Sequence, residues 1–140
     1  MLKGFLFGGT SGQSALGNLG EAGLRIFAGL SMAFGHGRGK VPPSDDFIKG
    51  VTDLGFPQIF AWVAGLSEFA GGILLAIGLA TRFSALMILG TMVVAAGVVH
   101  ADDPFGKKEM ALLYLAISFF FMLRGSGDLS VDALVRGKRR

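Results

Sequence analysis

The stretch LGFPQIFAWVAGLSEFAGGILLAIGLAT, residues 54–81, decides the fold, because it is long, apolar and carries a single charge, on Glu68. A helix of about 20 apolar residues is long enough to cross the hydrocarbon core of a bilayer, so this run is predicted to span a membrane. A carboxylate without a partner is costly in hydrocarbon. Glu68 is therefore predicted to be neutral, paired or turned toward a polar interior, either as structural glue or as a functional group.

The composition indicates one membrane domain rather than a soluble one. Hydrophobic residues make up 51% of the 140 residues and charged residues 16%, against about 25% in soluble proteins. The 23 glycines within apolar runs suit helices that pack closely in a membrane. With no cysteine, the chain has no disulfide and no thiolate ligand or nucleophile. The net charge of +3 is too small, and too concentrated at the C-terminus, to indicate nucleic-acid binding.

Four apolar runs predict an all-α, integral membrane four-helix bundle. The predicted spans are about 18–37, 56–80, 83–101 and 106–125, followed by a basic tail over 126–140. At about 1.5 Å per residue each span covers roughly the 30 Å of the hydrocarbon core. A soluble helical bundle is the alternative, and it is disfavoured because the runs leave almost no polar face for water.

The connection between the first two spans has the pattern of a short surface helix. Ser44 is placed to cap it, with acidic residues in the first turn, and apolar residues follow at helical spacing from Phe47 to Leu54. We predict an amphipathic helix on the membrane surface, with a solvated loop as the alternative. The two remaining connections, residues 81–84 and 100–109, are predicted to be tight turns.

An even number of spans places both termini on one side of the membrane. Lys and Arg favour that side by seven to five, so both termini are predicted to be cytoplasmic.

The ionisable residues within the spans fall at different depths. Glu68 lies near mid-depth, and Arg25, early in the first span, is predicted to reach it directly or through water. Glu21 lies one turn before Arg25 in a favourable order for an ion pair. The alternative for Arg25 is that it reaches the inner headgroups.

Two histidines and a carboxylate gather near the outer ends of the spans. The last span is long enough only if its helix starts near Gly106, which places Glu109 about one turn inside the boundary. His100 ends the preceding span, so His100 and Glu109 are predicted to hydrogen bond and to form the entry point for a proton. His36 ends the first span, either as part of this site or as an interfacial cap. No helix carries two ligands at metal-binding spacing, so no metal site is predicted, and no haem or flavin motif is present.

An ordered series of motifs resembles the DoxX family of small bacterial membrane proteins over about residues 21–132. The motifs are HGRGK (36–40), LGFP (54–57), SEFAGGILLAIGLATR (67–82), a span ending in His100, KKEMALLYLA (107–116) and GSGDLSVD (125–132). The resemblance implies a four-helix bundle in the bacterial inner membrane. The family's polar positions match Arg25, His36, Lys40, Glu68, Arg82, His100 and Glu109, and its closing turn matches Gly125, Gly127, Ser130 and Asp132. Ser126 and Asp128 depart from the family's closing turn, which speaks against anion binding there.

The resemblance also implies an association with redox chemistry. The leading hypothesis is a membrane subunit that interacts with a quinone, in which Glu68, His100 and Glu109 transfer protons. Arg25, His36, Lys40 and Arg82 are the predicted binding residues. Electrons would come from a partner or from the substrate. The alternatives are a non-catalytic accessory subunit packed against a membrane partner, and a homo-oligomeric transporter of small molecules; a stable partner or flux in liposomes would separate them.

Overall fold

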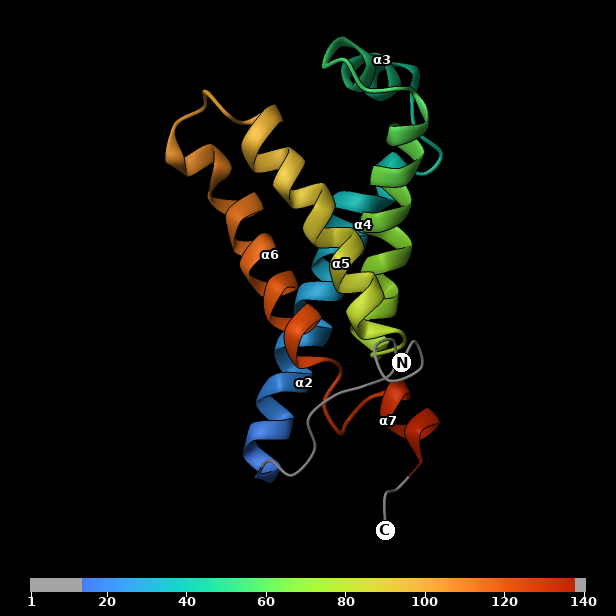
Figure 1. Ribbon diagram of the computed structural model, residues 1–140, viewed down its shortest axis with the longest axis vertical. Coiled ribbons are helices and arrows are strands. Elements are labelled where there is room, and N and C mark those ends of the chain that lie inside the picture. The colour runs from blue at the N-terminus through green and yellow to red at the C-terminus, as the bar shows by residue number, and fades with distance from the viewer. Residues whose placement is uncertain (1–13, 138–140) are drawn as a thin grey trace.

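The computed structural model describes residues 14–137, and every regular element in that range is a helix (Figure 1). This confirms the predicted all-helical class. In chain order the elements are α2 (Ala15–Leu30), η1 (Ser31–Gly37), η2 (Arg38–Lys40), α3 (Asp45–Asp53), α4 (Ile59–Ile77), α5 (Thr81–Val94), η3 (Ala95–Val99), α6 (Phe105–Arg124) and α7 (Val131–Arg136).

Two of the predicted spans have the length and composition of membrane helices. Ile59–Ile77 and Thr81–Val99 are each 19 residues long and apolar enough to cross a bilayer. The two other long helical rods are α2 continued by η1, which we call the first rod, and α6. Among the described residues, neither meets the same test of length and hydropathy. Charged side chains explain the difference for α6, whose first turns carry Lys107, Lys108 and Glu109 and whose last residue is Arg124.

The predicted surface helix is present as α3, which lies across one end of the bundle (Figure 1). The Ser44 hydroxyl accepts a hydrogen bond from the backbone N–H of Phe47 at 3.2 Å, which caps the first turn. Asp45 and Asp46 occupy that turn, where the helix dipole favours negative charge. The solvated-loop alternative is therefore excluded.

Glycine contacts fix how the first helical rod packs on α4. A Cβ added at Gly29 would lie 2.5 Å from the carbonyl oxygen of Gly72, and one at Gly37 would lie 2.3 Å from the backbone nitrogen of Phe69. A Cβ at Gly65 would lie 2.4 Å from the carbonyl oxygen of Lys40. The two backbones thus touch along their length, as small residues allow in membrane helix pairs. This contact sets the register that places Lys40 beside the middle of α4.

The turn between α4 and α5 comes earlier than the sequence indicates. The expected turn at residues 81–84 is wrong, because α5 already begins at Thr81 and the connection is residues 78–80. Gly78 ends α4 with φ 71°, a left-handed conformation that favours glycine. A Cβ at Gly78 would also lie 2.1 Å from Nη1 of Arg25, so this turn has no room for a side chain.

Arg25 hydrogen bonds to the C-terminal end of α4 rather than to its middle. Its Nη1 donates hydrogen bonds to the carbonyls of Leu75 and Ala76, at 3.0 and 2.9 Å. Its Nη2 donates to the carbonyl of Leu129 at 2.6 Å. The side chain is 1% exposed. A guanidinium at this position satisfies carbonyls that the last turn of a helix leaves without partners.

Asp132 provides the matching contact at the start of α5. Its carboxylate accepts hydrogen bonds from the backbone N–H groups of Ala80 (2.7 Å) and Thr81 (3.0 Å), and it is fully buried. The first N–H groups of a helix lack intrahelical partners, and a carboxylate there both caps them and complements the dipole. The closing segment, residues 125–136, is thereby fastened to the α4–α5 turn.

Replacing Asp132 by Ala is expected to loosen the closing segment and to lower the free energy of unfolding by about 1–3 kcal/mol, because one buried and one partly buried N–H group lose their acceptor. Thermal unfolding in detergent measures the effect. Asp128→Ala, which removes one partly buried contact with Asn18, serves as the control and should cost less. Equal melting temperatures for the two variants would contradict the capping role.

Candidate functional site

A cavity of about 210 Å³ lies between the first rod, α4, α5 and α6. It brings together four of the seven residues that the sequence singles out: His36, Lys40, Glu68 and His100. These residues come from four different parts of the chain, namely η1, η2, α4 and the end of η3. The remaining lining residues are Met32, Met92, Ala95, Lys107, Met110, Ala111 and Tyr114.

The buried carboxylate of Glu68 forms an ion pair with Lys40. The Lys40 ammonium lies 2.8 and 2.6 Å from the two carboxylate oxygens, and Glu68 is 2% exposed. The Lys40 side chain retains 32% exposure, so the pair links a buried carboxylate to the cavity. The predicted contact between Glu68 and Arg25 is wrong, because the glycine register puts Glu68 opposite Gly37 and puts Arg25 at the far end of α4.

His100 is oriented by a carboxylate from its own loop. Its Nδ1 lies 2.8 Å from Oδ2 of Asp103, whose other oxygen lies 3.3 Å from the ammonium of Lys107. Hydrogen bonds from His100 and Lys107 hold the pKa of Asp103 below its usual value. A carboxylate on one ring nitrogen fixes the orientation of the imidazole and leaves the other ring nitrogen for a further hydrogen bond.

The predicted contact between His100 and Glu109 is wrong. Glu109 is exposed and does not line the cavity, although His100 does. The cause is helical phase. The cavity-lining residues of α6 fall at i, i+3, i+4 and i+7 from Lys107, a single helix face, and Glu109 lies off that face.

Both histidines of the cavity are associated with π-helical segments. His36 lies within η1, and His100 directly follows η3. Such widened turns occur preferentially at functional sites, because they redirect side chains that a regular helix would aim elsewhere. No sequence pattern indicated these segments.

Tyr114 and Lys107 are members of the site that sequence reasoning missed. Tyr114 is the single tyrosine of the chain, is 8% exposed, and packs edge-on against His36 with ring centroids 5.4 Å apart. It lies seven residues after Lys107, on the same face of α6. That spacing was visible in the sequence, but the apolar neighbours of Tyr114 made it resemble core packing.

An apolar groove of about 440 Å³ adjoins the cavity, between α3, α4 and α5. The groove and the cavity share four lining residues: Lys40, Glu68, Ala95 and His100. Phe47, Phe60 and Leu86 are among the apolar residues of its walls. The polar site is therefore continuous with a surface suited to hydrocarbon.

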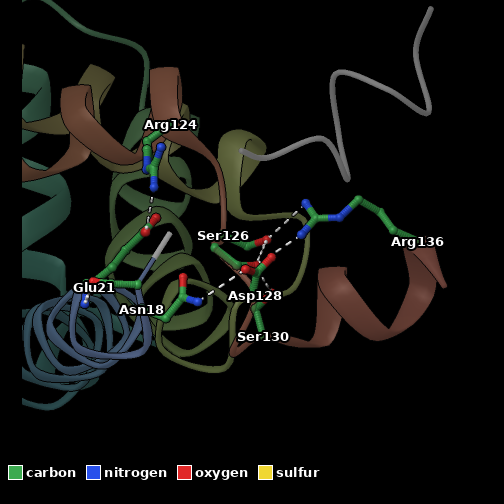
Figure 2. Close-up of polar contacts among 10 residues, drawn as sticks. Asn18, Glu21, Arg124, Ser126, Asp128, Ser130 and Arg136 are labelled. Atoms are coloured by element: carbon green, nitrogen blue, oxygen red, sulfur yellow. Dashed lines mark hydrogen bonds and ion pairs between the residues drawn. The ribbon is translucent and has the colours of Figure 1, made fainter. Parts of the chain in front are cut away.

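Arg25 and Arg82, predicted as binding residues, lie away from the cavity. Nη2 of Arg82 donates to the carbonyl of Leu123 at 3.0 Å, near the end of α6. The predicted pair between Glu21 and Arg25 is replaced by one between Glu21 and Arg124, at 3.2 Å (Figure 2). Arg25 and Arg82 both donate to carbonyls near helix ends, so their contacts stabilise the fold rather than the cavity.

The closing segment carries a network of its own beside α2. Figure 2 shows Asn18 next to Asp128, and Arg136 next to Ser126. The contacts of this segment join helix ends and its own backbone, and they lie at the end of the bundle opposite α3. Within residues 14–137, no group of three or more His, Cys, Asp or Glu side chains is arranged to hold a metal ion.

Over residues 14–137, these features define a small all-helical protein with two membrane-length apolar helices and a polar cavity that adjoins an apolar groove. The profile of the DoxX family matches residues 20–101, and the chain belongs to this family of membrane proteins. It is 32% identical over 123 residues to a Bacillus subtilis (strain 168) protein named "Putative oxidoreductase CatD", covering 86% of this chain and 91% of that protein. No solved structure matches the chain.

Proposed function

We propose that this chain is a four-span membrane protein of a redox system, and that its cavity binds the head group of a quinone. The single observation that carries the proposal is the meeting of His36, Lys40, Glu68 and His100 around one cavity that is continuous with an apolar groove. The name of the Bacillus subtilis relative, which describes an oxidoreductase, supports a redox role.

Crossing of the membrane by all four rods is supported by their surfaces and lengths. Large apolar side chains are exposed on the two rods that the composition test leaves out, including Phe27 at 72% and Leu123 at 60%. Such a surface suits lipid rather than water. The 20 residues of α6 measure about 30 Å, and its charges lie in its first two turns and at its last residue. In this arrangement both ends of the chain lie on one side, which we propose is the cytoplasm.

The cavity offers the chemistry that a quinone requires. Reducing a quinone to a quinol takes two electrons and two protons, and the carbonyl oxygens need hydrogen-bond donors. His100, oriented by Asp103, and the Tyr114 hydroxyl can donate, while the buried Glu68 and the partly exposed Lys40 form a pair that can pass a proton onward. A partner protein or a reduced substrate supplies the electrons.

Replacing His100 by Gln tests this role in purified protein. We expect the affinity for a benzoquinone without a side chain, measured by titration calorimetry in detergent, to fall about tenfold, because the hydrogen bond from His100 to a quinone carbonyl is lost. Lys49→Gln is the control and should bind like the wild type, since Lys49 pairs with Asp53 on the exposed face of α3. A wild-type protein that binds no benzoquinone, or a His100→Gln variant of full affinity, would contradict the proposal.

An accessory subunit is the second candidate, and the surface of α2 favours it. Gly20 and Gly23 have open space where a Cβ would lie, and Leu16 and Leu19 beside them are 82% and 62% exposed. The glycines of α4 are not available for a partner in the same way, because Gly72 already packs on the first rod, Gly65 packs on η2 and Gly71 packs on α5. A stable membrane partner recovered in mild detergent, and lost on replacing Gly23 by Leu, would support this role.

A further inference from the structure

We propose that the groove between α3, α4 and α5 holds the long apolar chain of the ligand, and that this chain enters sideways from the bilayer. The inference rests on the proposed head-group site and adds the chemical class of the ligand: a long-chain amphiphile rather than a small water-soluble quinone.

The volumes and linings of the cavity and the groove suit different parts of such a molecule, the polar ring and the apolar chain respectively. Ligand pockets usually measure about 300–1,000 Å³, so the cavity of about 210 Å³ suits little more than a ring, whereas the groove of about 440 Å³ lies within that range. The cavity holds the charged residues and the groove is walled largely by apolar side chains. Lys40, Glu68 and His100 line both spaces, so a molecule with its polar end among them has its apolar end in the groove.

The side walls of the groove point to entry from lipid. They are formed by α4 and by α5 continued through η3, the two segments of residues 14–137 that are long and apolar enough to cross a membrane. Phe60, Val63 and Leu86 line the groove and are 47%, 39% and 42% exposed. In a bilayer these exposed faces meet acyl chains, so the groove opens into the hydrocarbon rather than into water.

The roof of the groove is the amphipathic helix α3. Its residues Phe47 and Val51, and Leu54 just after it, follow at i, i+4 and i+7 and line the groove. No residue of α3 is buried, so the groove leaves this apolar face incompletely covered. The ammonium of Lys40 lies 5.5 Å from the centroid of the Phe47 ring, which ties the roof to the Lys40–Glu68 pair below it. An apolar chain lying in the groove covers this face.

Filling the groove tests the inference without disturbing the packing. Gly90 of α5 lines the groove, and a Cβ there would meet nothing within 4 Å, so Gly90→Leu projects a side chain into the space. Gly97 in η3 also has open space at its Cβ but lines neither the groove nor the cavity, so Gly97→Leu is the matched control. The ligands are a chainless benzoquinone and the same ring with a decyl chain, titrated in the same detergent.

We expect wild type and Gly97→Leu to bind the decyl compound at least about tenfold more tightly than the chainless one, because several methylenes leave water. Gly90→Leu should lose this preference while keeping its affinity for the chainless compound. If Gly90→Leu keeps the full preference, the groove does not hold the chain and this inference is overturned. If the wild type binds the chainless compound without any preference for the decyl chain, the inference also fails while the head-group site stands. If the wild type binds neither compound, the proposed function itself fails.

Discussion

Replacing Gly72 by Ala is expected to lower the free energy of unfolding by about 2–3 kcal/mol, because the added methyl group has no space. Its Cβ would lie 2.7 Å from the carbonyl oxygen of Gly29 and 2.8 Å from the backbone nitrogen of Ala33. Both neighbours are backbone atoms, which cannot rotate away, so the first rod and α4 must separate along this contact. The midpoint of thermal unfolding in detergent, followed by circular dichroism, measures the loss.

The control for this prediction is Gly23→Ala on the exposed face of α2, where a Cβ would meet nothing within 4 Å. Alanine is the better helix former, so this variant should be as stable as the wild type or up to about 1 kcal/mol more stable. If the two variants unfold at the same temperature, close backbone packing does not hold these helices together.

Replacing Lys40 by Met is expected to destabilise the protein by about 2–3 kcal/mol, since it leaves the carboxylate of Glu68 buried without its cation. Removing one partner of a fully buried pair costs about 3–5 kcal/mol. The expected loss is smaller here because Lys40 retains 32% of its side-chain exposure and the cavity admits water.

Two further variants separate the charge from the packing of Lys40. Adding Glu68→Gln to Lys40→Met removes the stranded charge, so the double variant should be more stable than Lys40→Met alone. Lys49→Met breaks an exposed i,i+4 pair with Asp53 and should change the stability by about 0.5 kcal/mol or less. A Lys40→Met variant that unfolds like Lys49→Met would show that the Glu68 pair contributes nothing to stability.

The local pattern of the chain was enough to predict the helices, the surface helix and four of the residues that line the cavity. Apolar runs gave the rods, and Ser44 with the two aspartates after it gave α3, because capping and periodicity act over a few neighbouring residues. Burial cost alone marked Glu68 as paired or turned to a polar interior. The motifs that carry the resemblance to the DoxX family included His36, Lys40 and His100, and these line the cavity together with Glu68.

Which residues pair with which was decided only by the tertiary structure. The depth of a residue along its span does not specify how neighbouring helices align. Backbone contacts at Gly29, Gly37 and Gly65 set this alignment, and as a result Glu68 pairs with Lys40 rather than with Arg25. The direction in which Glu109 points around its helix could not be predicted either. Successive residues of a helix are rotated by about 100°, so Glu109, one residue before the cavity-lining Met110, faces away from the cavity. The sequence by itself thus determined the helical elements and four polar residues of the cavity. The pairing of side chains and the shape of the cavity depend on contacts between segments far apart in the chain, which cannot be predicted from a local sequence pattern.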